Sequence, residues 1–158
     1  MKAETFLSRH TLFSHEELAG ALLVRGLSPA TVQSHLARWL RRGRVTRVKR
    51  GVFVRSDGDG GVAATAVDFV ALASRMAPDA VVAFHTALEA HGVAQSVFER
   101  LTFVTWTKAK ATSFQGRELV PVRPRAGLAE GGGGAWVERI ERSGIEVRVT
   151  DIERTVAD

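Results

Sequence analysis

The 158-residue chain contains no cysteine, which excludes disulfide bonds and metal sites built from thiolates. A reducing compartment is the default expectation for such a chain. The N-terminal segment is interrupted by Lys2, Glu4 and Arg9 and therefore lacks the apolar core of a signal peptide. No apolar run approaches the roughly 18–20 residues that a membrane helix needs. We therefore expect a soluble, cytoplasmic protein.

The motifs of common enzyme and nucleotide-binding sites are also missing. The sequence has no G-x-x-x-x-G-K-[ST] phosphate loop, no G-x-G-x-x-G after a strand and no G-x-S-x-G nucleophile elbow. None of the four lysines follows an acidic residue at the spacing of an E-x-K nuclease motif. His85 and His91 are six residues apart, so a helix would place them on different faces rather than around one metal ion. We expect a protein that is not an enzyme and that uses no cofactor and no metal.

Acidic residues are absent from residues 35–55, which carry eight basic ones. Residues 1–55 hold eleven Lys/Arg against three Asp/Glu, a net charge of +8, whereas residues 56–158 hold eleven against fourteen, a net charge of −3. Such asymmetry indicates that one half contacts a polyanion. The polar, Gly-rich segment between the halves is typical of a linker. We predict a first domain at residues 1–56, a linker at 57–62 and a second domain at 63–158.

The first domain is predicted to contain three helices and a β-hairpin. The apolar residues of the first 23 positions fit two short helices, the second of which starts with an S-x-x-E capping box at residues 14–17. Ser28 is the predicted N-cap of the third helix, and Gly43 follows its end. β-Branched residues then flank an Arg50-Gly51 turn, which is typical of a hairpin. A helix followed by a basic hairpin is the pattern of a recognition helix and its wing, so we predict a winged helix-turn-helix.

The third helix has a predicted buried stripe and a polar face opposite to it, at 100° per residue. The stripe consists of Val32, Leu36, Trp39 and Leu40. Short polar residues near the helix start suit entry into a major groove, and Arg38 is the best-placed side chain for a base contact. The cations at the helix end and on the hairpin are predicted to contact phosphates. The predicted DNA-binding residues are Thr31, Ser34, His35, Arg38, Arg41, Arg42, Arg44, Arg47, Lys49 and Arg50.

The second domain alternates helical and strand patterns, so the whole chain is predicted to be α+β. Predicted helices cover residues 66–76 and 86–91, and predicted strands or turns cover residues 81–84, 101–107, 119–122 and 145–149. Residues 131–134 are four glycines and are predicted to form a flexible loop or hairpin tip. Asp151 is the predicted cap of a final helix. Because a helix of two turns has little to stabilise it, we expect the second domain to continue beyond residue 158.

Three segments of the chain occur in an order that is similar to a known family. The wing reads RRGRVTRVKRGVFV, and the later motifs are HTALEAHG and DIERTVAD. Together they resemble the AbiEi antitoxin family, which has a Ser/Ala-Leu-His-Gly type motif and a later Pro-Glu-Arg-Thr-Leu-Val-Asp type motif. The matching positions are Ala87, Leu88, His91, Gly92, Glu153, Arg154, Thr155, Val156 and Asp158. Ile152 stands where Pro is common, and Ala157 precedes the final Asp.

This resemblance covers nearly the whole chain and implies an antitoxin that is also a transcriptional autorepressor, from an AbiE-type toxin–antitoxin or phage-defence system. The winged helix would bind repeats of double-stranded DNA in its own promoter. The second domain would counter a cognate nucleotidyltransferase-like toxin, in many members without a stable complex. Two alternatives stay open: a stand-alone transcription factor whose second domain senses a ligand or partner, and the N-terminal part of a nuclease-like protein.

Overall fold

The computed structural model describes residues 2–56, 67–96, 98–124, 134 and 136–157. The chain divides into two compact units, Met1–Val67 and Asp68–Asp158, and both contain helices and strands, which confirms the predicted α+β class. The predicted linker at residues 57–62 and the glycines at residues 131–133 lie outside the described residues. No helix in the described part of the chain is long and apolar enough to cross a membrane.

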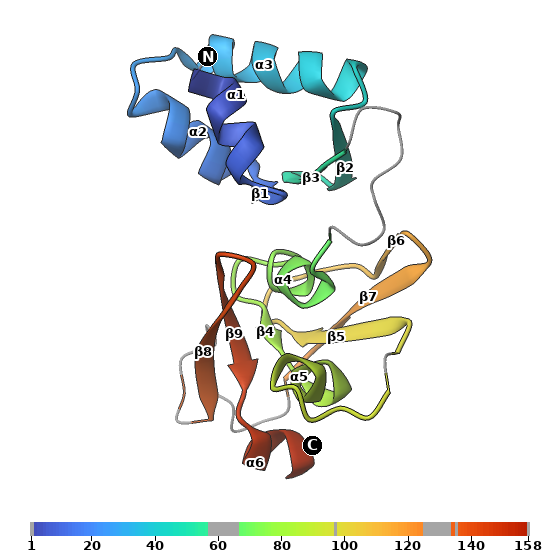
Figure 1. Ribbon diagram of the computed structural model, residues 1–158. Coiled ribbons are helices and arrows are strands. Elements are labelled where there is room, and N and C mark those ends of the chain that lie inside the picture. Colours follow the sequence, from blue (N-terminus) through green and yellow to red (C-terminus); the bar gives the residue numbers. More distant parts are fainter. Residues whose placement is uncertain (1, 57–66, 97, 125–133, 135, 158) are drawn as a thin grey trace. The chain divides into compact units, whose positions relative to one another are not determined.

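The first unit consists of three helices and a three-stranded antiparallel sheet (Figure 1). Its elements follow the order α1 (Lys2–Arg9), β1 (Leu12–Ser14), α2 (His15–Leu23), α3 (Pro29–Arg41), β2 (Val45–Lys49) and β3 (Val52–Arg55). The strand order is β1-β3-β2, so the hairpin gains a third strand from the segment between α1 and α2. The helical prediction for Leu12 and Phe13 was therefore wrong, because both residues pair with β3.

The core of the first unit joins all three helices to the sheet. Phe13 lies at its centre, with its ring edge-to-face with Phe6 at 5.3 Å and stacked with Phe53 at 5.7 Å between centroids. Val32, Leu36 and Trp39 of α3 are buried in the same cluster, and Leu40 packs at its margin. The predicted buried stripe of α3 is thus confirmed, and Trp39 is a core residue.

The sequence signals that start the helices of this unit are present as hydrogen bonds. The backbone N–H of Glu17 donates to Ser14 Oγ at 3.1 Å, and the N–H of Ser14 donates to Glu17 Oε2 at 2.7 Å. The N–H of Thr31 donates to Ser28 Oγ at 3.2 Å. Both caps satisfy N–H groups that a helix start leaves without intrahelical partners.

A glycine turn at Gly43 connects α3 to the hairpin. Gly43 has φ of +65°, a left-handed conformation that residues with a Cβ adopt only at a cost. Its N–H donates to the carbonyl of Leu40, and the N–H of Arg44 donates to the carbonyl of Trp39. This is the hydrogen-bond pattern of a Schellman motif, and it fixes the direction in which the chain enters β2.

The second unit has a six-stranded mixed sheet in the order β6-β7-β5-β4-β9-β8. Its helices are α4 (Phe69–Ser74), α5 (Phe84–Ala90) and α6 (Ile152–Ala157). Its strands are β4 (Val81–Val82), β5 (Arg100–Val104), β6 (Thr112–Phe114), β7 (Arg117–Val122), β8 (Val137–Arg142) and β9 (Ile145–Thr150). The predicted helix at residues 86–91 and the predicted strands at residues 119–122 and 145–149 correspond to α5, β7 and β9.

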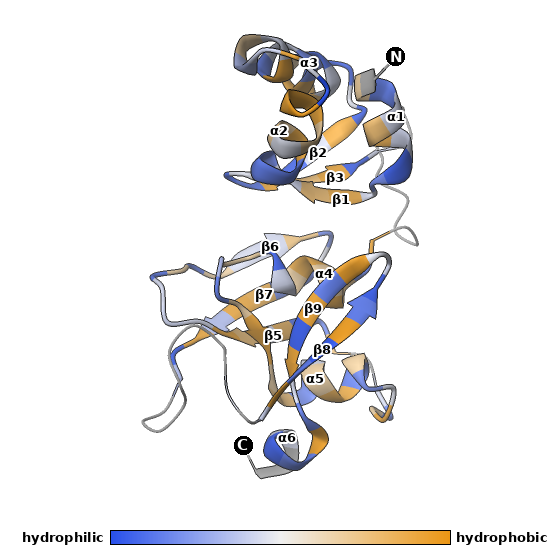
Figure 2. Cartoon of the chain, turned by 90° about the vertical axis from the view of Figure 1, so that its left-hand side faces the viewer, coloured by the Kyte–Doolittle hydropathy of each residue, from blue (hydrophilic) through white to orange (hydrophobic). Residues whose placement is uncertain are grey.

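Helices α4 and α5 cover the same face of this sheet (Figures 1 and 2). The side chain of Arg117 on β7 shows this directly, because it lies 4.6 Å from the ring centroid of Phe69 in α4 and 3.8 Å from the carboxylate of Glu89 in α5. The strand registers align Val82 with Phe103 and with Val149 under the helices, and all three are buried. This layer is the core of the second unit.

Candidate nucleic-acid interface

The exposed face of α3 carries the residues that were predicted to enter a DNA groove. Thr31, Ser34 and Arg38 are exposed, opposite to the buried stripe. The Oγ1 of Thr31 shares a hydrogen bond with Ser28 Oγ at 2.8 Å, and Ser34 Oγ donates to the carbonyl of Ala30 at 2.9 Å. Each hydroxyl oxygen keeps lone-pair capacity toward solvent, so both side chains are fixed in place and still able to accept hydrogen bonds.

Arg38 is positioned by a neighbour on its own helix. Its Nη2 donates to Nδ1 of His35 at 3.2 Å, and the His35 ring lies 6.0 Å from the ring of the buried Trp39. His35 is half-buried, whereas Arg38 is exposed. The guanidinium therefore has a support at one edge, and its remaining N–H groups can donate to a base in a bidentate contact.

The hairpin presents its cations around a tight turn. Gly51 has φ of +82°, as the turn after Arg50 requires, and the pairing register shifts between Arg47 and Lys49. The guanidinium carbon of Arg47 lies 5.7 Å from the ring centroid of Phe53, its direct partner on β3. Such a cation–π contact holds the stem of Arg47 on the sheet while its side chain stays exposed.

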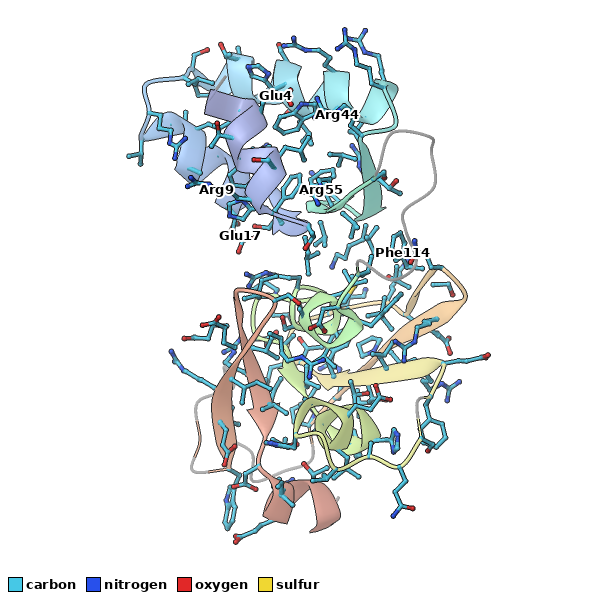
Figure 3. All side chains as sticks on the ribbon, in the orientation of Figure 1. Glu4, Arg9, Glu17, Arg44, Arg55 and Phe114 are labelled. Carbon is cyan, nitrogen blue, oxygen red and sulfur yellow. The ribbon has the colours of Figure 1, made fainter. Side chains whose placement is uncertain are left out.

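Arg44 differs from the other predicted phosphate contacts. Its Nη1 lies 2.7 Å from Oε2 of Glu4 on α1, and the side chains of Arg44 and Glu4 are 41% and 48% exposed (Figure 3). The other oxygen of Glu4 accepts a hydrogen bond from Nε1 of Trp39 at 3.0 Å. The hydrogen bond from Trp39 lowers the pKa of Glu4 below its usual value, burial opposes this, and the hydrogen bond and charge of Arg44 lower it further. Glu4 was not among the predicted site residues, because 35 residues separate it from Trp39.

Arg55, a basic residue of the segment 35–55 that was not among the predicted site residues, binds the backbone of α1. Its Nη1 donates to the carbonyls of Leu7 and Ser8 at 3.2 and 2.8 Å, at the C-terminal end of α1. A cation at this position also complements the helix dipole. The remaining seven basic residues all lie on α3 or the hairpin or between them, and five of these are exposed: Arg38, Arg41, Arg42, Arg47 and Arg50.

The second unit offers no comparable constellation in the residues that the structure describes. It contains no group of three or more His, Cys, Asp or Glu side chains placed to hold a metal ion in that described part. His85 Nε2 donates to the carbonyl of Ser96 and His91 Nε2 donates to the carbonyl of Thr150, each at 2.8 Å. The two histidines thus bind backbone carbonyls in different parts of the second unit.

The two motifs of the second unit meet in space. Helices α5 and α6 lie side by side, and His91, at the end of α5, bonds to the carbonyl of Thr150 at the end of β9, two residues before α6 begins. Thr155 Oγ1 donates to the carbonyl of Asp151 at 2.6 Å, and the N–H of Arg154 donates to Asp151 Oδ1 at 2.7 Å. The predicted capping role of Asp151 is confirmed. These polar residues hold α6 against the end of β9.

Two carboxylates of the second unit, Asp68 and Asp79, have structural partners. Burial alone would raise the pKa of Asp68, but hydrogen bonds from Arg142 and the backbone of Ala71, together with the Arg142 charge, hold it below its usual value. Burial would also raise the pKa of Asp79. Hydrogen bonds from the Thr105 side chain and the Trp106 backbone outweigh this effect and hold the pKa below its usual value. The same bonds end β5 at Val104, so the predicted strand at residues 101–107 was too long by three residues.

The chain matches no known protein-family model and no curated protein. Its functional assignment therefore depends on the chemistry of its own residues. The surface with the clearest chemistry is the cationic one on α3 and the β2–β3 hairpin, which offers hydrogen-bond donors and positive charge. Such a surface suits binding of a polyanion.

Proposed function

We propose that the first unit is a winged helix-turn-helix and that the protein is a DNA-binding transcriptional autorepressor and antitoxin, without enzymatic activity. The observation that carries the proposal is the exposure of a cationic helix face beside a cationic hairpin in one unit. The element order α1-β1-α2-α3-β2-β3 and the strand order β1-β3-β2 support it, because they put a hairpin directly after the basic helix. In this proposal α3 is the recognition helix and the hairpin is the wing.

The proposed binding mode divides the residues into two groups. Thr31, Ser34 and Arg38 face the base edges in a major groove, where an arginine recognises guanine through two hydrogen bonds. The cations near the end of α3 and on the wing contact phosphates, which position the protein without reading the sequence. This second group consists of Arg41, Arg42, Arg44, Arg47, Lys49 and Arg50.

Arg47→Ala tests the wing. The substitution removes an exposed cation, so we expect weaker binding to every DNA sequence. The slope of log K against log salt should become shallower by about one unit. A gel-shift assay repeated at several salt concentrations measures both quantities. The control is Arg9→Ala, which removes the same charge from an exposed position on α1. Equal effects of the two substitutions would contradict a specific role of the wing.

The antitoxin part of the proposal is supported by the resemblance to the AbiEi family and by the meeting of its two motifs at α5 and α6. It is tested by co-expressing the toxin gene that the proposal expects next to this one. Cells that also produce the full chain are expected to grow, and cells that produce only residues 1–56 are expected to stop growing while the promoter is still repressed. If the full chain gives no protection, the protein is a transcription factor without antitoxin activity.

A further inference from the structure

Glu4 places a negative charge directly against the cationic surface. Its two carboxylate oxygens have different partners, since Oε1 accepts from Trp39 Nε1 at 3.0 Å and Oε2 lies 2.7 Å from Arg44 Nη1. The indole of Trp39 is only 1% exposed, so it anchors one end of the carboxylate to the core. The other end is thereby presented to Arg44 in a fixed position.

The contact between Glu4 and Arg44 resembles the contact that a phosphate would make. A carboxylate and a DNA phosphate each offer anionic oxygens to a guanidinium at the same distance. Both side chains remain about half exposed, which leaves Arg44 accessible from solvent. A glutamate is charged at neutral pH, so the ion pair is formed there, and the lowered pKa of Glu4 keeps it formed under more acidic conditions.

We propose that Glu4 is an internal competitor of DNA phosphate at Arg44 and that it thereby lowers binding to non-specific DNA. The inference rests on the DNA-binding function proposed above. A cation already paired with an internal carboxylate adds little to the counterion release that drives non-specific binding. A phosphate that contacts Arg44 must first displace Glu4, and this cost lowers the affinity for every duplex. Glu4 therefore limits the affinity of the surface for DNA without touching a base.

Glu4→Gln is the appropriate test because glutamine keeps an oxygen that can accept from Trp39 and loses only the charge. Breaking an exposed ion pair corresponds to a change of about two- to fivefold, so we expect non-specific duplex to bind about two- to fivefold more tightly. The slope of log K against log salt should become steeper by about one unit. Binding to the specific site should gain by a similar factor, because Arg44 is proposed to contact a phosphate in both modes.

Two further variants separate competition from a general effect of charge. Glu16→Gln removes the same charge from an exposed position in the first turn of α2. In an Arg44→Gln background, Glu4→Gln should change non-specific binding no more than Glu16→Gln does. Thermal unfolding of each variant, followed by circular dichroism, measures any change in stability.

The outcomes distinguish this inference from the function on which it rests. If the wild-type chain binds no duplex DNA at low salt, the proposed function fails, and the inference fails with it. If wild type binds DNA but Glu4→Gln behaves like Glu16→Gln, or keeps its effect without Arg44, the inference alone is overturned. It is also overturned if Glu4→Gln lowers stability and weakens specific and non-specific binding equally, since Glu4 would then act only in the fold.

Discussion

Replacement of Trp39 by Ala is expected to lower the free energy of unfolding of the first unit by about 3–5 kcal/mol. The side chain is 1% exposed and lies in the cluster that joins the three helices to the sheet. Its removal leaves a cavity beside Leu36 and also deprives Glu4 of the indole N–H. Both effects destabilise the orientation of α3, so DNA binding should be lost together with the fold.

Urea unfolding of the full chain, followed by circular dichroism, measures this change in free energy. The matched control is Trp136→Ala, because Trp136 is 48% exposed in the second unit. A surface substitution of this kind usually changes stability by no more than about 0.5 kcal/mol. If the two substitutions destabilise the protein equally, Trp39 does not have the core role that the structure gives it.

Arg38→Ala is expected to weaken binding to the specific site by about 1–3 kcal/mol, or roughly 5- to 150-fold, and to relax the sequence preference. Arg38 is exposed on α3, and His35 accepts a hydrogen bond from it at 3.2 Å, which restrains its guanidinium. Loss of a base contact should leave non-specific binding nearly unchanged apart from the loss of one charge.

Selection of preferred sites from a random DNA pool measures the sequence preference of Arg38→Ala directly. The comparison variant is Arg42→Ala, at an exposed position at the end of the same helix. Arg42→Ala should weaken binding to all DNA sequences by the same factor, because the proposed contact of Arg42 is a phosphate. The proposed base contact would be contradicted if Arg38→Ala kept the wild-type sequence preference and lost as much DNA affinity as Arg42→Ala.

Much of the first unit was predictable because its signals act over a few residues. The capping box of Ser14 and Glu17, the cap at Ser28 and the turn at Gly43 each depend on neighbours within four positions. The buried stripe of α3 follows from helical periodicity alone. In contrast, three residues are too few to show strand alternation, so β1 becomes evident only through its pairing with β3.

The interactions that escaped prediction span long stretches of sequence. Glu4 contacts Trp39 and Arg44 across the whole helical part of the first unit, and no local pattern indicates that pairing. In the second unit, strands β6 and β8 are the two edges of the sheet. Edge strands bury less of their surface, and the sequence VERIER of β8 places charged side chains at most positions. Its pattern therefore resembles a polar loop.

The sequence was sufficient to predict which residues form the candidate site, but not which partners their side chains bind. All ten predicted residues lie on α3 or the hairpin or between them, and seven of these are exposed: Thr31, Ser34, Arg38, Arg41, Arg42, Arg47 and Arg50. On α3, exposure follows from the same helical periodicity that identifies the core. The ion pair of Arg44 and the support of Arg38 by His35 depend on the folded geometry.

The most direct test of the central claim is the salt dependence of binding between the wild-type full chain and duplex DNA from upstream of its own gene. Of the six proposed phosphate contacts, Arg44 adds little because it is paired with Glu4, so the other five predict a slope of log K against log salt of about −4.5. A scrambled duplex of equal length should bind more weakly with a similar slope. Absence of binding at the lowest salt concentration, or an affinity that does not change with salt, would contradict the account.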